Sequence, residues 1–257
     1  MCCVMKNLCV FIGIIFFGAS SGFAQLKSVM LVPFDSKLFN NQESEFMLED
    51  SDMSYEQSIQ FFTTSLDEHL TRAVKDTMRI HSLLRTYTTD AYSDIDIVHQ
   101  QADYVLTERP QSISEKKDLS AFQNAKNRFK KRKKSTQRVA PPDGEVVSEK
   151  EDNSNKFLSV KFVDPQVFID LIRNYNVDYV VFITQFEILG DYSNPYAVAQ
   201  QSYLRTIRVH YAIFDESGKF VYGDYETKTF SASHNNISEV CSQNFPEIAR
   251  KIMRRVP

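Results

Sequence analysis

The hydrophobic positions divide this chain into an apolar leader, two periodic regions and a polar stretch between them. Residues 8–17 form an uninterrupted apolar run, and the regions 27–106 and 157–257 mix short apolar runs with helical spacing of apolar residues. Residues 109–155 carry few apolar positions and many charges. The pattern predicts one folded domain over residues 25–257, interrupted by a charged insert at about 109–155.

The first periodic region predicts strands and one long helix. Residues 27–34 form a short apolar run closed by a proline, typical of a buried strand, and residues 35–53 are polar and predict a loop. Ser54 and Gln57 have the spacing of a capping box, which predicts a helix that extends to about residue 75. Shorter strands are predicted in the apolar runs that follow, at 80–86, 95–98 and 104–106.

The second periodic region carries stronger signals. Asp164 and Pro165 predict an N-cap and the first turn of a helix. Residues 177–189 are β-branched and aromatic, as in a central strand that is covered on both faces at its start. Two alternating strands at 203–214 and 219–230 flank a turn, and Asn235 or Asn236 caps a last helix. The series predicts an α/β (α+β) fold, a single layered domain with a mixed β-sheet that carries helices.

The leader has the composition of a cleavable signal peptide. Lys6 precedes the apolar run, and small residues precede a predicted cleavage between Ala24 and Gln25. The run is too short to span a bilayer, although a buried N-terminal helix is an alternative. Gln25 stands where a lipoprotein requires cysteine, and Met5 fits a signal start better than Met1. We expect a protein of the periplasm or outer envelope, without a transmembrane segment after cleavage.

Cysteine usage fits this expectation. Cleavage removes Cys2, Cys3 and Cys9 and leaves Cys241 alone, so no internal disulfide can form. Cys241 lies on the apolar side of the predicted last helix, where a buried thiol is favoured over a reactive one.

Charge is distributed in blocks. Residues 43–52 hold five acids and no base, residues 126–138 hold eight bases and no acid, and residues 143–152 are acidic again. The basic block resembles a nucleic-acid signal, but export makes lipid headgroups, lipopolysaccharide phosphates or acidic proteins the available polyanions. A solvated loop with balanced charge is the alternative. The candidate polyanion-binding residues are Lys126, Arg128, Lys130, Lys131, Arg132, Lys133, Lys134 and Arg138.

Motifs for catalysis are absent from the sequence. The five histidines lack zinc spacing, and no glycine-rich phosphate loop or nucleophile elbow is present, so we expect no catalytic residue, metal or cofactor. Asp35 follows the first strand, where α/β folds place functional residues. Glu187 and Arg205 lie on neighbouring predicted strands and could approach each other, and His210 is expected on a sheet surface. A hydrolase with a site of scattered residues stays as an alternative.

Several short motifs resemble known envelope domains. A strand that ends in Pro33-Phe34, a helix that leads into Asp178-Tyr-Val, and a hairpin at Asp215-Glu-Ser-Gly218 recur in such domains. The chain resembles the amino-terminal domain of TolB and the curli-secretion (CsgG-like) proteins, and it is similar to uncharacterised exported bacterial proteins. The resemblance implies a non-catalytic module that binds envelope proteins. Binding of anionic envelope surfaces through residues 126–138 is the alternative function.

Overall fold

A computed structural model describes residues 26–74, 76–85, 89–110 and 155–257, with the side chains of 89–93 excluded. The signal peptide, its cleavage residues Ala24 and Gln25, and the basic block 126–138 lie outside these ranges. The elements in chain order are β1 (Ser28–Val32), η1 (Ser36–Leu38), β2 (Phe39–Asn41), α2 (Ser44–Ser51), α3 (Tyr55–Ala73), β3 (Arg79–Ser82), α4 (Thr89–Gln101), β4 (Ala102–Glu108), β5 (Lys156–Phe162), α6 (Pro165–Tyr175), β6 (Tyr179–Gly190), α7 (Pro195–Ala199), β7 (Leu204–Asp215), β8 (Phe220–Ser231) and α8 (Ile237–Met253).

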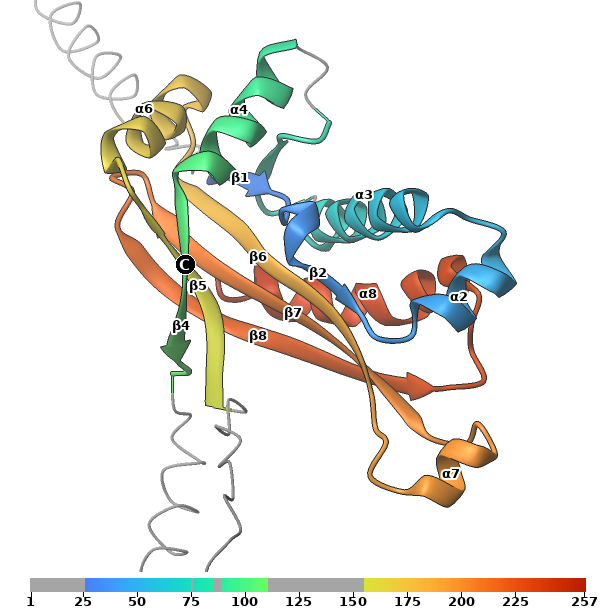
Figure 1. Cartoon of the computed structure of the whole chain (residues 1–257). Coiled ribbons are helices and arrows are strands. Elements are labelled where there is room, and N and C mark those ends of the chain that lie inside the picture. The colour runs from blue at the N-terminus through green and yellow to red at the C-terminus, as the bar shows by residue number, and fades with distance from the viewer. Residues whose placement is uncertain (1–25, 75, 86–88, 111–154) are drawn as a thin grey trace, which may run out of the picture.

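A mixed six-stranded sheet forms the centre of the fold. Its strand order is β3-β1-β6-β7-β8, and β2 pairs with the far end of β6 (Figure 1). Strand β1 runs parallel to both β3 and β6, whereas β6, β7 and β8 form an antiparallel meander. This architecture confirms the predicted α/β fold with a mixed sheet.

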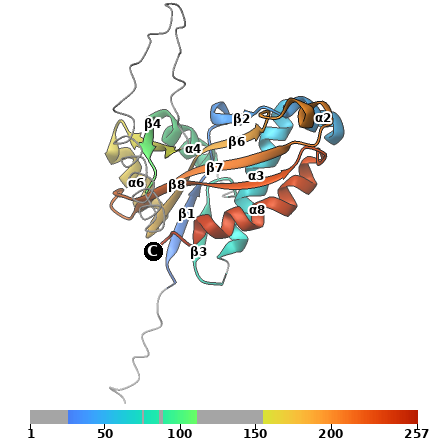
Figure 2. The ribbon, with the colours of Figure 1, turned by 90° about the horizontal axis from the view of Figure 1, so that it is seen from below.

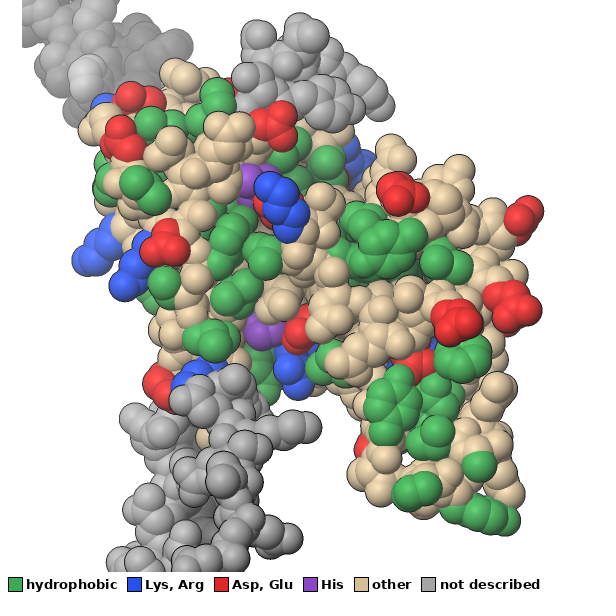
Figure 3. Space-filling view, viewed as in Figure 1, with side chains coloured by type: hydrophobic (Ala, Val, Ile, Leu, Met, Phe, Trp, Pro, Cys, Tyr) green, Lys and Arg blue, Asp and Glu red, His purple; other side chains and the backbone are tan. Residues whose placement is uncertain are grey.

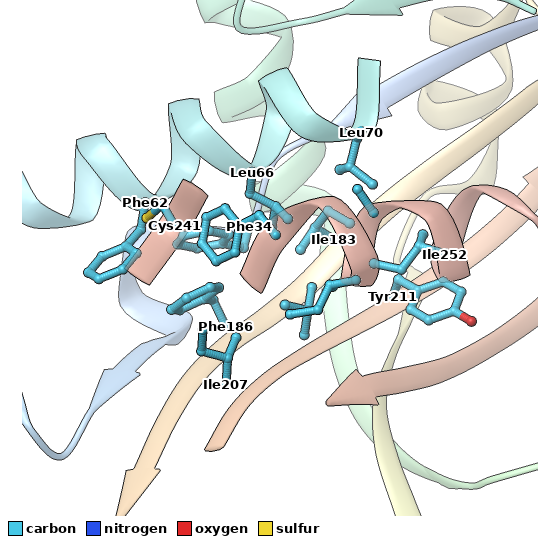
Figure 4. Close-up of a cluster of buried hydrophobic side chains, with 14 of the residues drawn as sticks. Phe34, Phe62, Leu66, Leu70, Ile183, Phe186, Ile207, Tyr211, Cys241 and Ile252 are labelled. Carbon is cyan, nitrogen blue, oxygen red and sulfur yellow. The ribbon is translucent and has the colours of Figure 1, made fainter. Parts of the chain in front are cut away.

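Each face of the sheet has its own hydrophobic core. Helices α3 and α8 cover one face, and Figure 4 shows Phe62 and Leu66 of α3 opposite Phe186 and Ile207 of the sheet. The other face is covered by α4, α6 and the β4–β5 pair, where the buried Phe168 belongs to the second core (Figure 2). The sheet is therefore buried on both sides where β1 and β6 begin.

Local sequence signals explain where the long helices start. The Ser54 side chain accepts a hydrogen bond from the backbone N–H of Gln57, and both halves of the capping box are present in α3. The Asp164 side chain caps α6 and Asn236 caps α8, as predicted. Cys241 in α8 is 1% exposed, and burial raises the pKa of its thiol to about 12, which confirms a buried structural cysteine.

Three element predictions were wrong or incomplete. Residues 35–53 are not a loop but form η1, β2 and α2, because Met47 of α2 is buried against the core. Residues 95–98 belong to helix α4, where the fully buried Val98 contributes to the second core, and not to a strand. Strand β5 was not predicted, and it forms because it pairs antiparallel with β4, with Glu108 opposite Lys156.

The insert leaves the domain through this two-stranded arm. The backbone N–H of Arg109 donates to the carbonyl of Asn155 at 2.9 Å, which joins the two strands at the end where the insert begins. Residues 111–154, most of the predicted insert, lie outside the described ranges. Among the helices of the described residues, none is long and apolar enough to cross a membrane.

Candidate functional site

A cleft of about 380 Å³ opens at the carboxyl ends of β1 and β3. Such a place, where the chain crosses from one side of β1 to the other, is the usual ligand position in open α/β sheets. Asp35 lines it, as the sequence predicted, together with residues of α3 and α4. However, Asp35 Oδ1 accepts the backbone N–H of Lys37 at 2.9 Å and caps η1, which is a structural task.

Asp67, the most buried acid in the cleft, is already hydrogen-bonded and ion-paired with neighbouring residues. Asp67 accepts hydrogen bonds from Ser82 Oγ and from Arg85 Nε, both at 2.7 Å. Burial raises the pKa of Asp67, and these two contacts oppose the shift only in part. Asp67 therefore ties α3 to the end of β3 and offers no free carboxylate to a ligand.

His99 is the only histidine that lines this cleft among the described residues. Its Nδ1 lies 2.8 Å from the hydroxyl of Tyr104, and burial lowers the pKa of the ring. The same cleft is lined by hydroxyl side chains of Ser36, Thr63 and Thr64. The described residues also contain no group of three or more His, Cys, Asp or Glu able to hold a metal ion.

A second polar network anchors the β4–β5 arm to the main sheet. His210 Nδ1 accepts the backbone N–H of Leu158 at 2.8 Å, and its Nε2–H donates to Glu187 at 3.2 Å. This pair of bonds fixes the orientation of the ring. Burial alone raises the pKa of Glu187, but contacts with His210, Arg208 and Asn40 outweigh burial and lower it. His210 therefore lies on a face of the sheet, as predicted. Its side chain is nevertheless buried beneath β5, with only 4% of the residue exposed.

The predicted approach of Glu187 to Arg205 is wrong. The register places Glu187 opposite Arg208 and places Gly190 opposite Arg205. Because side chains alternate along a strand, Arg205 points to the opposite face from Arg208. Glu187 accordingly forms an ion pair with Arg208, whose Nη1 lies 3.3 Å from its carboxylate, and Arg205 pairs with another acid.

That acid is Glu43, which precedes α2 and is fully buried. Arg205 Nε donates to Glu43 at 2.8 Å, and the hydroxyls of Tyr203 and Tyr192 also donate to this carboxylate. A Cβ on Gly190 would lie 2.4 Å from Glu43 Oε1, so the end of β6 requires glycine here. Partial burial, together with the hydrogen bond to Glu43, raises the pKa of Tyr192 to about 12. This cluster locks α2 and the β6–β7 connection together.

Above this cluster lies an exposed hydrophobic surface, which we name the α2–α7 surface. Its members come from α2, from the connection that contains α7, and from the start of β7, and Figure 3 shows hydrophobic side chains gathered over the projecting α7. They are Phe46 (42% exposed), Tyr192 (49%), Tyr196 (71%) and Leu204 (52%). Clusters of exposed large aromatic and aliphatic side chains are typical of protein-binding surfaces.

No pattern in the sequence predicts the α2–α7 surface. The segment that follows the predicted strand 177–189 carried no predicted site, yet Asn194 Oδ1 accepts the backbone N–H of Tyr196 and Pro195 begins α7. An Asn-Pro pair followed by an aromatic residue was the available signal. Glu43 stood within the acidic block, and only the three-dimensional contact with Arg205 distinguishes it.

No protein family model matches the chain, and no curated protein matches it. A solved structure of the hypothetical protein CT253 from Chlamydia trachomatis is similar, with 10% sequence identity and a TM-score of 0.35 over 90% of this chain and 95% of that one. The resemblance to TolB and curli-secretion domains stays a prediction.

Proposed function

We propose that this chain is an exported, non-catalytic module of the cell envelope that binds a partner protein through the α2–α7 surface. The observation that carries the proposal is the outward exposure of Phe46, Tyr192 and Tyr196 beside Leu204. Tyr and Phe contribute large contact areas at protein interfaces. The resemblance to envelope docking domains implies the same kind of activity.

The residues of the cleft support an enzymatic function less well than the α2–α7 surface supports partner binding. Asp67 is tied to Ser82 and Arg85, Asp35 caps η1, and His99 is hydrogen-bonded to the hydroxyl of Tyr104. A hydrolase needs polar groups that converge on a substrate. A partner-binding module needs an exposed apolar surface, and the described residues offer one.

Binding of anionic envelope surfaces through residues 126–138 ranks second. That block lies outside the described residues, so its support is the sequence alone. Helix α2 carries Glu45 and Glu49 next to Phe46. Acids beside the exposed aromatics oppose insertion of this surface into an anionic bilayer, and we therefore favour a protein partner.

Photo-crosslinking tests the proposal. A photoreactive phenylalanine analogue replaces Tyr196 in the full chain, expressed in its own host, and replaces Phe220 in a matched control. Phe220 is 43% exposed at the β7–β8 turn and lies outside the α2–α7 surface. We expect a discrete crosslinked protein from position 196 only. Equal crosslinking from both positions, or none from 196, would contradict the proposal.

A further inference from the structure

Strand β8 forms an open edge of the six-stranded sheet. It extends over 12 residues, and within the described part of the chain only β7 pairs with it. Exposed edge strands are usually kept from pairing with other chains by short length, proline, lysine or a bulge. β8 is long and has no proline, its single lysine is bound to Glu247 of α8, and its register shift against β7 lies at the hairpin end. The rest of this edge therefore lacks the usual protection.

The register against β7 shows which backbone groups of β8 point outward. The backbone N–H of Ala232 donates to the carbonyl of Tyr203 at 3.0 Å, which continues the β7–β8 ladder. Because the backbone groups of an antiparallel strand point alternately toward the neighbouring strand and away from it, the even-numbered residues 224–230 face β7 and the odd-numbered ones face outward. Tyr225 agrees with this assignment, since its N–H donates to the side chain of Asp224 at 2.8 Å.

The β4–β5 arm covers the half of this edge nearest the hairpin. A Cβ on Gly223 would lie 2.5 Å from the ring of Phe157, so β5 lies directly against β8 at this point. Arg109 at the end of the arm pairs with Asp224, and its guanidinium lies 4.0 Å from the centre of the Tyr225 ring. This half of the edge is therefore closed to another chain.

The other half of the edge is open. Both backbone groups of Thr227 and Thr229, and the N–H of Ser231, point outward and have no hydrogen-bond partner among the described residues. The carbonyl of Ser231 accepts the N–H of His234 at 3.1 Å, which ends the open segment. Figure 1 shows the arm and α7 projecting past β8 on either side of this segment. An added strand lies only about 4.8 Å beyond the edge, so a single extended chain suits this position better than a folded second copy.

Glu226 gives the open edge a preference for a cation. Its carboxylate is half-buried and forms no ion pair within the described residues. Burial raises the pKa of Glu226, and the more distant Lys251 and Arg255 offset this shift only in part. A strand added to the edge places a side chain about 5 Å from Glu226 on the same face of the sheet. A Lys or Arg in that position supplies the missing ionic partner.

We propose that the partner protein binds by adding an extended segment to β8 at residues 226–231, with a Lys or Arg of that segment beside Glu226. This inference rests on the proposed function, because it gives the binding mode of the same partner. Leu204 of the α2–α7 surface lies opposite Ser231, so the open edge ends where that surface begins. Backbone hydrogen bonds to Thr227 and Thr229 supply affinity, and the exposed rings of the surface contact the end of the added segment.

Amide hydrogen exchange in the purified full chain, followed by NMR, tests whether the edge is open. After correction for intrinsic rates, we expect the amides of Thr227 and Thr229 to exchange at least about tenfold faster than those of Glu226 and Lys228, which donate to β7. Equal protection of the two sets would show that the edge is already paired, with another part of the chain or with a second copy. That result overturns the inference.

Photo-crosslinking from position 196 in the host tests whether the partner uses the edge. Thr227→Pro removes an outward N–H and places a ring in the path of an added strand, but it leaves the ladder to β7 intact. We expect capture of the partner to fall at least about tenfold in this variant. Thr227→Ala keeps the N–H and is the matched control, with capture within about twofold of the natural chain. Equal capture in the two variants overturns the inference.

Two charge variants test the edge without a proline. Glu226→Gln removes the unpaired carboxylate, and we expect capture from position 196 to fall at least about threefold. Lys228→Gln is the matched control, because Lys228 lies two residues away on the same face and carries the opposite charge. Its capture should not fall. An equal fall in both variants, or none in Glu226→Gln, rejects the cation beside Glu226.

Failure of this inference is distinguishable from failure of the proposed function. A partner captured from position 196 in the natural chain and in all the edge variants supports the function and rejects strand addition. Absence of any captured partner in the natural chain rejects both. Capture that depends on the Thr227 N–H and on the Glu226 carboxylate supports both.

Discussion

The ion pair between Glu43 and Arg205 is the most consequential pair of residues in the described structure. The two side chains are 0% and 2% exposed, and each is buried with the other as its charged partner. Removal of one partner of a buried pair leaves an unpaired buried charge, which costs about 3–5 kcal/mol. We predict a loss of this size in the free energy of unfolding for Glu43→Ala, measured by urea denaturation.

A double variant separates pairing from burial. Glu43→Met combined with Arg205→Met removes both charges, so its loss of stability should be smaller than that of Glu43→Ala alone. The exposed pair Glu68–Arg72 on α3 is a matched control, because its side chains are 40% and 65% exposed. Truncation of Arg72 should cost no more than about 0.5 kcal/mol. A loss as small as this for Glu43→Ala would show that the buried pair is not needed.

At this scale the sequence identified residues but not their partners. Glu187 and Arg205 were both chosen as candidates, and both are buried in ion pairs. The predicted pairing of Glu187 with Arg205 was wrong because the register of β6 against β7 depends on the bulge at Ile183–Gln185 and on the length of the connection between the two strands. A shift of one residue turns a side chain to the other face of a sheet, so pairing cannot be read from neighbouring strands alone.

Among the elements, the β4–β5 arm has the most specific attachment. Both backbone groups of Leu158 are held by side chains of the main sheet: its N–H by His210, and its carbonyl by the hydroxyl of Thr184. Thr184→Val keeps the shape of the side chain but leaves this buried carbonyl without its donor. We predict a local cost of about 1–3 kcal/mol, or roughly a 5- to 150-fold rise in amide exchange in β4 and β5.

Hydrogen exchange with mass spectrometry measures this effect segment by segment. Thr184→Ser is the control, because it keeps the hydroxyl and should retain most of the protection in the arm. Exchange in α3 and in the buried half of β6 should stay unchanged in both variants. Unaltered exchange of the arm in Thr184→Val would mean that the hydroxyl does not fasten it.

Elements with their own local signals were predicted well, and elements made by tertiary contact were not. The capping box at Ser54 and the Asp164–Pro165 start marked α3 and α6 within one or two residues. Helix α4 was taken for a strand because its apolar run is short and its burial comes from packing near α6. Strand β5 follows a charged segment, and only its pairing with β4 makes it a strand. The α2–α7 surface could not be predicted for the same reason, since its members come from three separate segments.

For the molecule as a whole, the position of the insert predicts how the domain responds to its loss. Both hydrophobic cores are built from described residues, and the arm closes with the hydrogen bond from Arg109 to Asn155. Replacing residues 110–154 with a four-residue turn shortens the loop about elevenfold, which lowers the entropic cost of closing it by about 2 kcal/mol. We therefore predict a higher urea midpoint for the shortened chain, and the same near-ultraviolet circular dichroism.

A second chain isolates the cause of that gain. Replacing the same residues with a Gly-Ser linker of equal length keeps the loop entropy and removes only the contacts of the insert. Its stability should match the natural chain within about 1 kcal/mol, because both hydrophobic cores consist of residues outside the replaced segment and changes away from a core cost roughly this or less. A shortened chain that unfolds more easily than the linker chain would show that the two strands of the arm need the longer connection to pair. If both chains are destabilised by several kcal/mol, the insert belongs to the folded core, and the division into one domain with a peripheral charged segment is wrong.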